Sequence, residues 1–537
     1  MKRIVLLLQL VILTVCTPAQ TIERPKLIVG IVVDQMRWDY LYRYFDRYAA
    51  NGGFKRMLRD GFSCENTLIN YTPSVTACGH ASIYTGSVPA IHGITGNTWI
   101  DRQSNQVVYC TEDKTVKTIG SNTASGLMSP ANLLTTTISD ELRLATNFRS
   151  KVIGIALKDR GSILPAGHKA NAAYWYDIQT GDWITSSYYG TDLPKWVKDF
   201  NAKKPVDKYY AQDWNTLYPV NTYAQSTADD KPYEAKPLGK TFPYSLKQFA
   251  GKNYSIITVT PYGNSLTTEF AKAAITAEGL GTGNSTDLLA ISYSSTDYVG
   301  HTFGPNSIEA EDVFLRMDKE LGELLDFLDS KIGKNQYLVF LSADHGVVQA
   351  PGFLQENSIP AGSFSADIVG SLNSQLRQQF GRDRIIGDAM NYQLHLNRSV
   401  IDSFKLNEKE IINAIIRQST TIKGIARAID ITQLRNATLN QKVQEMLING
   451  YFPNRSGDIQ LIFAPQWIEG YTSGGTTHGL WNPYDTHIPL LWYGWGIKAG
   501  KTNREIYITD IAPTLAALLH IQMPSGCVGV PIEEVRR

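Results

Sequence analysis

The chain has 537 residues, with 51 lysines and arginines against 50 aspartates and glutamates. This balance offers no basic field for nucleic acid and no polybasic segment for a membrane surface. After the amino-terminal run, no stretch approaches the roughly 20 consecutive apolar residues that a membrane-spanning helix needs. We therefore expect neither nucleic acid as a specific partner nor stable membrane insertion, and any anion must bind at a local site.

The amino terminus has the pattern of a secretory signal peptide. A charged start at residues 1–3 precedes a short apolar run over residues 4–15 and a small-residue segment that ends at Ala19. This arrangement predicts a signal peptide over residues 1–19, cleavage after Ala19, and a soluble periplasmic or secreted protein. Cys16 raises the alternative of a lipoprotein signal, which the bulky Val15 disfavours because such signals want a small residue there.

Four cysteines remain after this cleavage, and none has zinc-finger spacing. In an oxidising compartment we expect one or two disulfides, and the sequence leaves all three full pairings open. The residues are Cys64, Cys78, Cys110 and Cys527.

Three apolar runs, at residues 27–33, 288–293 and 337–342, are each followed within a few residues by carboxylates or imidazoles. Between the second and third runs, apolar residues recur every three or four positions over residues 309–332, which predicts an amphipathic helix. A strand, a crossover helix and a second strand indicate a parallel, doubly wound α/β sheet. Polar residues after such strands converge at one edge of the sheet, where active sites of this architecture lie.

Two long segments interrupt this pattern. Residues from about 163 to 285 are rich in aromatic residues, glycine and proline, and we interpret them as an inserted cap. Residues from about 352 to 472 contain amphipathic segments at 368–380 and 406–416, and we expect a second subdomain on the same sheet. Near the end, residues 488–493 predict another strand and residues 510–519 a helix. Because the polar residues run from position 34 to 478 and must converge, we expect one catalytic domain over residues 20–537.

Carboxylates and imidazoles follow the apolar runs in a pattern that suits metal ions. Asp297 and His301 are four residues apart, so both would face one ion on a helical turn or tight loop. The doublet Asp344-His345 precedes a glycine that lets the backbone turn, and His478 lies in a glycine-containing loop. Taken singly, each has an ordinary alternative, such as a solvated loop pair or an N-cap aspartate.

Thr76 is the candidate nucleophile. A threonine hydroxyl needs a metal or a base to attack at neutral pH. As an isolated residue it could instead cap the helix that begins here, and a helix N-terminus would also favour an anionic phosphoryl group. Ser74 and Cys78 are competing nucleophiles in the same segment.

The ordered motifs resemble the alkaline phosphatase superfamily, and within it the phosphate-irrepressible type of periplasmic phosphomonoesterase. The resemblance covers essentially the whole mature chain and implies a three-layer α/β/α sandwich with a mostly parallel central sheet. It also implies one zinc ion held by Asp297, His301 and His478 and a second held by Asp34, Asp344 and His345. Thr76 would lie between them, in contact with the metal site, as the phosphorylated residue. The motifs are Val33-Asp34-Gln35-Met36, Thr72-Pro73-Ser74-Val75-Thr76, Gly93-x-x-Gly96-Asn97, Lys158-Asp159-Arg160, Asp297-x-x-x-His301, Ser342-Ala343-Asp344-His345-Gly346 and Thr477-His478-Gly479.

Lys158 and Arg160 point to a monoesterase. On a strand or extended loop, residues two apart face the same way, so both cations could bind non-bridging phosphoryl oxygens, and Asn97 would add a neutral donor. The ordinary alternative is a solvated Lys-Asp-Arg loop. The resemblance implies that related phosphodiesterases lack this pair.

The remaining histidines have weaker signals. His80 and His92 lie near the nucleophile and could support ligands, and His487 follows His478 closely enough to be weighed as a ligand. His168, His395 and His520 are interpreted as structural or exposed.

The sequence therefore predicts an exported, monomeric alkaline phosphatase that uses two zinc ions to hydrolyse small phosphate monoesters. The alternatives are a nucleotide pyrophosphatase or phosphodiesterase of the same superfamily and an inactive phosphate- or metal-binding relative.

Overall fold

The computed structural model describes residues 23–536, except 365–366 and 472–473. The expected signal peptide at residues 1–19 lies outside the described residues. Among the described residues, no helix is both long enough and apolar enough to cross a membrane.

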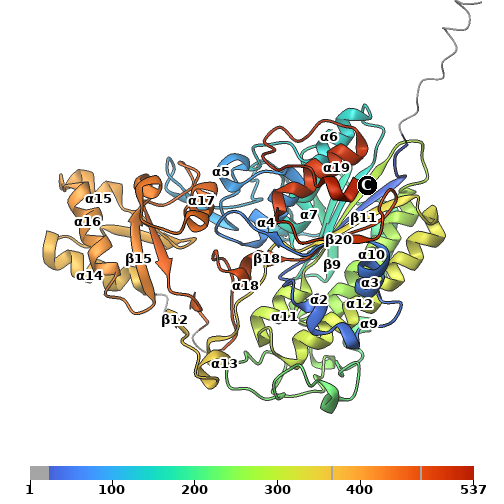
Figure 1. Ribbon diagram of the computed structural model, residues 1–537, viewed down its shortest axis with the longest axis horizontal. Coiled ribbons are helices and arrows are strands. Elements are labelled where there is room, and N and C mark those ends of the chain that lie inside the picture. Colours follow the sequence, from blue (N-terminus) through green and yellow to red (C-terminus); the bar gives the residue numbers. More distant parts are fainter. Residues whose placement is uncertain (1–22, 365–366, 472–473, 537) are drawn as a thin grey trace, which may run out of the picture.

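A ten-stranded mixed sheet forms the centre of the molecule (Figure 1). The inner strands are apolar and buried along their whole length, which is typical of a sheet covered on both faces. In spatial order the strands are β20 (Gly500–Thr502), β2 (Phe62–Cys64), β19 (Leu490–Gly494), β11 (Tyr337–Ser342), β1 (Leu27–Val33), β10 (Asp287–Tyr293), β7 (Val152–Ala156), β8 (Ala172–Asp177), β9 (Asp182–Ser186) and β6 (Thr118–Ile119).

The five strands from β11 to β8 are parallel, whereas β19 and β9 run antiparallel to their neighbours. The predicted helix over 309–332 is α12 (Ile308–Leu328), which connects β10 to β11. These two strands are not adjacent, because β1 lies between them and pairs in parallel with both. The crossover therefore passes over the first strand of the chain.

Helices cover both faces of the sheet, which gives the α/β/α sandwich (Figure 1). The predicted helix near the carboxyl terminus is α19, and it packs beside α4. One layer contains α4 (Thr76–Thr85), α6 (Ile138–Ala145), α7 (Asp159–Ala166) and α19 (Ile511–Leu519), and the other contains α3 (Gly53–Asp60), α10 (Tyr262–Glu278), α11 (Ser295–Phe303) and α12.

The segment 163–285, interpreted above as a cap, is divided between sheet and surface. Its first part supplies β8 and β9 to the central sheet, and its last part is α10, which packs against β10. Only the middle, between α8 (Lys195–Ala202) and α10, consists of short helices and loops. The aromatic cluster at Tyr174 and Trp183 was misleading, because these side chains pack on Phe270 of α10 inside the core.

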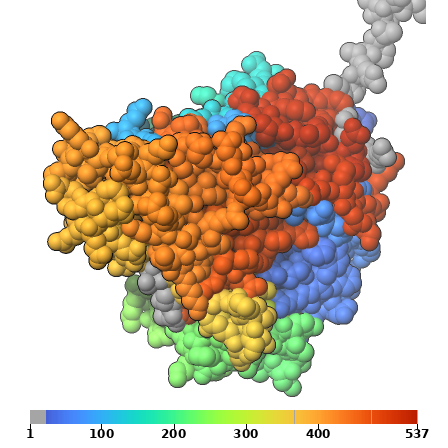
Figure 2. Space-filling model, turned by 60° about the vertical axis from the view of Figure 1, so that its left-hand side comes forward, coloured from blue at the N-terminus to red at the C-terminus, as the bar shows by residue number. Residues whose placement is uncertain are grey.

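The second subdomain has its own sheet, which corrects the expectation that it shares the central one. All its strand pairs are antiparallel, in the order β13 (Ile386–Met390), β14 (Gln393–Leu396), β16 (Ile459–Phe463) and β15 (Ile425–Asp430). The amphipathic segments are α14 (Ile368–Phe380) and α16 (Glu408–Ser419), which bury one face in a separate hydrophobic core. In Figures 1 and 2 this orange subdomain projects from one side of the body.

The expected disulfides are absent: the four cysteines of the described chain are free. Three of the thiols are buried, so they behave as small apolar core residues. The Cys78 thiol, for example, donates to the carbonyl oxygen of Ile94 at 3.2 Å.

Candidate active site

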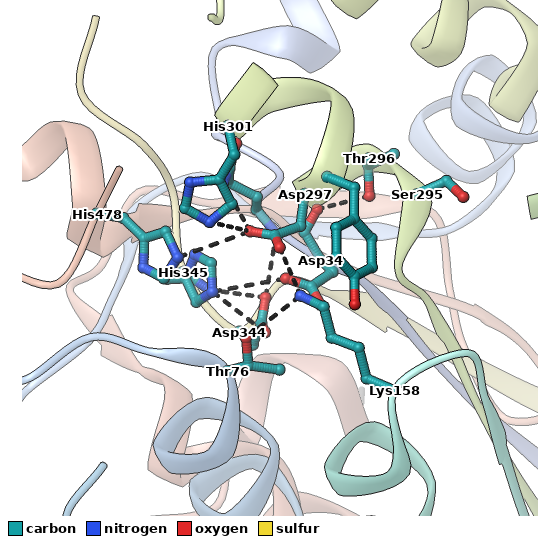
Figure 3. A network of polar contacts seen from close by, with 12 residues as sticks. Asp34, Thr76, Lys158, Ser295, Thr296, Asp297, His301, Asp344, His345 and His478 are labelled. Atoms are coloured by element: carbon teal, nitrogen blue, oxygen red, sulfur yellow. Dashed lines mark hydrogen bonds and ion pairs between the residues drawn. The ribbon is translucent and has the colours of Figure 1, made fainter. Parts of the chain in front are cut away.

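Three neighbouring parallel strands deliver most of the polar residues to one place (Figure 3). Asp34 follows β1, Asp297 lies in the first turn of α11 after β10, and Asp344 and His345 follow β11. The parallel register aligns Val33 with Tyr293 and Val32 with Ser342, so the ends of the three strands lie level. The carboxyl edge of the sheet thus gathers residues that are far apart in sequence.

Thr76 begins helix α4, with Val75 in the N-cap position. Thr76 is therefore the first helical residue and not the N-cap. The helix can approach the strand end because residue 79 is glycine: a Cβ atom there would lie 2.4 Å from the carbonyl oxygen of Asp344. Asn97 lies at the same helix end, where its Oδ1 accepts from the amide of Ala77 at 3.0 Å.

Six side chains present their donor atoms to one another at short range. His345 Nε2 lies 3.5 Å from Asp34 Oδ1 and 3.4 Å from Asp344 Oδ2. Asp297 Oδ1 lies 3.2 Å from His301 Nε2 and 3.6 Å from His478 Nε2. In a tetrahedral zinc site, with zinc–ligand distances of about 2.0–2.1 Å, neighbouring ligand atoms are about 3.3 Å apart. The observed separations match that spacing.

Two groups of donor atoms could each hold a metal ion. One contains Asp34, Asp344 and His345, and the other contains Asp297, His345 and His478. His301 joins the second group through Asp297, and His345 lies within reach of both because its ring stacks on that of His478 with centroids 3.4 Å apart.

Buried acceptors without partners support this fit. Asp34 Oδ1, Asp344 Oδ2 and His345 Nε2 are buried and make no hydrogen bond. Leaving such atoms unsatisfied is costly, and all three face one another, which fits a shared bound cation. The donor set of carboxylates and imidazoles suits a divalent transition metal.

The surroundings shift the pKa values of two carboxyl groups of the site in opposite directions. Burial and the negative charge of Asp344 raise the pKa of Asp34 well above its usual range. Burial would also raise the pKa of Asp297, but the charges of His301 and Lys158 hold it well below its usual range. Burial lowers the pKa of the His345 imidazole, and burial is also the largest cause that lowers the pKa of His478. Both side chains therefore favour the neutral form that binds metals.

Lys158 reaches the centre of the cluster from the end of β7 (Figure 3). Its ammonium nitrogen donates to Asp34 Oδ2 at 2.7 Å and to Asp297 Oδ2 at 2.5 Å, and lies 3.5 Å from Thr76 Oγ1. Burial opposes its charge, but the charges of Asp297 and Asp34 raise the pKa of Lys158 above its usual value. The cation is therefore held beside the candidate nucleophile.

Arg160 lies in the first turn of α7 and not on an extended segment. The expectation that two alternate positions of one strand present both cations is therefore wrong, because the strand ends at Ala156 and a helix begins at Asp159. Arg160 is held by its neighbours: it donates to Tyr109 Oη at 3.0 Å, and Tyr109 in turn donates to Asp159 Oδ1 at 2.8 Å.

Other candidate residues have structural partners. Ser74 Oγ donates to the carbonyl oxygen of Leu480 at 2.8 Å, and burial raises the pKa of the Cys78 thiol, so neither is prepared for attack. His80 touches the site, with Nδ1 2.9 Å from the Thr76 carbonyl oxygen and 3.3 Å from Asp344 Oδ2. His487 stacks on Trp38 and contacts the Glu65 carbonyl oxygen, away from the cluster.

The last histidines also lie elsewhere. His92 contacts Ser82 Oγ, and burial lowers its pKa to about 3. His168 contacts Asp140 and is half-buried, and His395 is buried in the second subdomain. His520 ends α19 at the surface.

Two contacts at the site were not expected from the sequence. Gln35 Nε2 donates to Asp297 Oδ1 at 2.6 Å, and its backbone amide donates to Asp344 Oδ1. The ring of Tyr471 stacks on that of His301, with 3.2 Å between Tyr471 Oη and His301 Nδ1. The position of Gln35 directly after Asp34 was a usable signal, whereas no local pattern links Tyr471 to His301.

Comparison with known proteins supplies the family. The model of the type I phosphodiesterase / nucleotide pyrophosphatase family matches residues 28–486. The chain belongs to this family. It is an enzyme of the alkaline phosphatase superfamily, and the matched region contains every residue of the site described above.

Relatives of high identity extend the family match to nearly the whole chain. Alkaline phosphatase PhoV of Synechococcus elongatus is 54% identical over 96% of this chain and 94% of its own. Alkaline phosphatase PafA of Elizabethkingia meningoseptica is 49% identical over 96% of this chain and 95% of its own. A relative from Myroides odoratus that is 53% identical, over 96% of this chain and 95% of its own, bears the name calcium-transporting ATPase.

The fold agrees with a solved structure. The present structure superimposes on the crystal structure of wild-type alkaline phosphatase PafA with a TM-score of 0.94 and 48% sequence identity. The match covers 96% of this chain and all of the PafA chain.

Proposed function

We propose that the protein is an exported alkaline phosphatase that hydrolyses phosphate monoesters through a phosphorylated Thr76. The observation that carries the proposal is the position of Lys158. Its ammonium lies 3.5 Å from Thr76 Oγ1 and bridges the carboxylates of the two metal-binding groups. A monoester dianion carries its negative charge on three terminal oxygens. A cation beside the nucleophile would pair with the terminal oxygen that does not contact either metal ion.

Each residue has one role in this proposal. Thr76 Oγ1 attacks phosphorus, the ester oxygen leaves on the opposite side, and water then hydrolyses the phosphothreonine to free phosphate. The N-terminus of α4 favours an anionic phosphoryl group beside Thr76, and Asn97 lies at the same helix end. Lys158 and Arg160 bind the non-bridging oxygens.

Two zinc ions fit the donor atoms. Asp34, Asp344 and His345 would hold one ion, and Asp297, His301 and His478 would hold the other. Bound zinc supplies positive charge that favours an ionised hydroxyl and stabilises the departing oxygen. The buried, unpaired atoms of Asp34, Asp344 and His345 support a bound cation, and the imidazole content favours zinc over manganese.

Export and a small-molecule substrate complete the proposal. The amino-terminal pattern supports a cleaved signal peptide and a periplasmic or secreted location. The names of the PhoV and PafA relatives support monoester hydrolysis, whereas the name of the Myroides relative does not. The proposal therefore rests on the site residues. We expect the enzyme to act as a monomer.

Phosphodiesterase activity is the second candidate, because the family is named for it. A diester replaces one charged terminal oxygen with an ester group, which would leave one of the two cations poorly paired. Lys158 and Arg160 therefore favour the monoesterase.

Acid-quench labelling tests the proposal. Purified enzyme incubated with a ³²P-labelled monoester and quenched in acid should carry label on Thr76, and metal analysis should find about two zinc ions per chain. Thr76→Ala is the matched control and should carry no label. Label on Ser74 or Cys78, or faster hydrolysis of a methyl aryl diester than of the aryl monoester, would contradict the assignment.

A further inference from the structure

A cavity of about 560 Å³ lies beside the metal-binding groups, next to His301. Its lining comes from segments that are distant in sequence: the loop at Tyr233, helix α13 (Pro351–Glu356) with Ser363, and the loop that carries Tyr471 and Gly475. Figure 2 shows the golden segment that contains α13 at the surface, next to the green segment that precedes α10 in the chain.

The wall of this cavity is bonded directly to the metal site. Tyr471 stacks on His301 at 5.6 Å between ring centroids and 5° between planes. The Gly475 amide donates to the Tyr233 carbonyl oxygen at 2.7 Å, and the next amide, of Thr476, donates to the His301 carbonyl oxygen at 2.9 Å. Only glycine fits at 475, where φ is 91° and a Cβ atom would lie 2.4 Å from the His301 carbonyl oxygen. Tyr471 and the Gly475–Thr476 backbone therefore join the wall of the cavity to His301.

The direction of the reaction points toward this cavity. Thr76 and His301 lie at opposite ends of the cluster in Figure 3. An in-line displacement expels the leaving oxygen on the side away from the nucleophile. An ester bound for attack by Thr76 thus extends its organic part past Asp297 and His301, toward Tyr471.

The lining suits an aromatic ring. Tyr233 and Tyr471 line the cavity, and Phe353 packs on Tyr233 edge-to-face with 6.3 Å between ring centroids. Gln355 and Ser363 add polar groups, and the ion pair of Lys231 with Glu356, at 2.6 Å, neutralises the charge on one side. Aromatic pairs prefer offset-stacked or edge-to-face contacts, which an uncharged ring could make here.

We propose that this cavity is a leaving-group subsite that selects phosphate monoesters whose alcohol carries an aromatic ring. The inference rests on the proposed monoesterase function and adds the class of substrate. Tyr233 is the specificity-determining residue, since Tyr471 also contacts a metal-binding histidine and cannot be changed without touching the site.

Ethyl phosphate and 2-phenylethyl phosphate provide the test, because both release a primary alcohol and differ only in the ring. In the zinc-loaded enzyme, Tyr233→Ala should lower kcat/KM for 2-phenylethyl phosphate by about 3- to 10-fold and leave ethyl phosphate within about twofold. Tyr233→Phe, which keeps the ring, should behave as wild type on both. Ser363→Trp, which fills the cavity, should reproduce the selective loss.

Binding distinguishes this inference from the proposed function. In Thr76→Ala, calorimetry should show that 2-phenylethyl phosphate binds more tightly than ethyl phosphate and that Tyr233→Ala removes the difference. Equal losses on both esters, or no loss on the aromatic one, would overturn the subsite. A wild-type enzyme that hydrolyses neither ester would contradict the monoesterase proposal, while the calorimetric comparison would still decide the subsite.

Discussion

The ten-stranded sheet and the sheet of the second subdomain differ in where their polar residues lie. Strands β1, β10 and β11 are buried throughout, so their polar residues collect beyond the carboxyl ends. Strands β13 and β15 of the subdomain are partly exposed, and their polar residues are spread along the strand. In a parallel sheet covered on both faces, polar groups can collect only beyond the carboxyl ends of the strands. A half-exposed sheet can carry polar groups anywhere along its solvent face, so they do not converge at one edge.

The subdomain instead supports the loops that carry the site. Tyr392 Oη donates to the carbonyl oxygen of His478 at 2.8 Å. Arg455 Nη1 donates to the carbonyl oxygen of Asn132 at 2.9 Å, and the amide of Thr72 donates to the carbonyl oxygen of Met446 at 3.1 Å. The candidate site thus lies in the body, and the position of two of its loops depends on both parts.

The largest expected effect belongs to the body. Thr76→Ala should reduce kcat for a phosphate monoester by more than about a thousandfold, because it removes the attacking oxygen and leaves the metal-binding atoms in place. Zinc content and thermal unfolding should match wild type. Activity within tenfold of wild type would show that another group attacks phosphorus.

The two cations should discriminate between ester classes. A charge-assisted hydrogen bond contributes about 1.5–3 kcal/mol, so Lys158→Ala and Arg160→Ala should each lower kcat/KM for an aryl monoester by about ten- to a hundredfold. The double variant should lose far less of its activity on the matching methyl diester. Equal losses on the two substrates would indicate a structural role and favour the phosphodiesterase.

Two variants compare the contributions of the body and the subdomain to the loop that carries His478. His478→Ala should lower the zinc content by about one ion per chain, because it removes a donor atom. Tyr392→Phe, from the subdomain, removes one hydrogen bond to the same residue and should cost only about 0.5–1.5 kcal/mol in unfolding free energy. Its zinc content should stay at the wild-type value, and loss of a full ion would assign the subdomain a direct part in metal binding.

The last effect concerns stability alone and depends on a buried carboxyl group in the body, away from the metals. Glu309 on α12 accepts a hydrogen bond from Tyr244, and burial, with the nearby charges of Asp229 and Asp312, raises its pKa to about 7. The folded state therefore binds its proton more tightly than the unfolded state, where the pKa is about 4.3. The binding of this proton therefore stabilises the folded state fully below about pH 4.3, the pKa in the unfolded chain. This contribution is lost as the pH rises through about 7, the pKa in the folded state.

Glu309→Gln stays neutral and should escape this loss. Urea unfolding should give similar free energies for variant and wild type at pH 5, and an advantage of about 1–3 kcal/mol for the variant at pH 9. Glu323→Gln is the matched control on the same helix, because that side chain is 71% exposed. An equal pH dependence in Glu309→Gln and wild type would contradict the raised pKa.

The sequence by itself determined the local elements and the residue types that could collect at one site. The buried run at 27–33 is β1 within its stated bounds, and the amphipathic segment 368–380 is α14. Asp297 and His301 come together on one helix, as their spacing indicates. These predictions succeed because periodicity and spacing are properties of neighbouring residues.

Only the tertiary structure decided which distant residues meet. It places β1 between β10 and β11, assigns the subdomain a sheet of its own and leaves the cysteines of the described chain unbonded. It sets Tyr471 on His301 and Lys158 between Asp34 and Asp297, although more than a hundred residues separate the members of each pair. The closing of long loops around a packed core fixes such contacts, and no local pattern of residues records them.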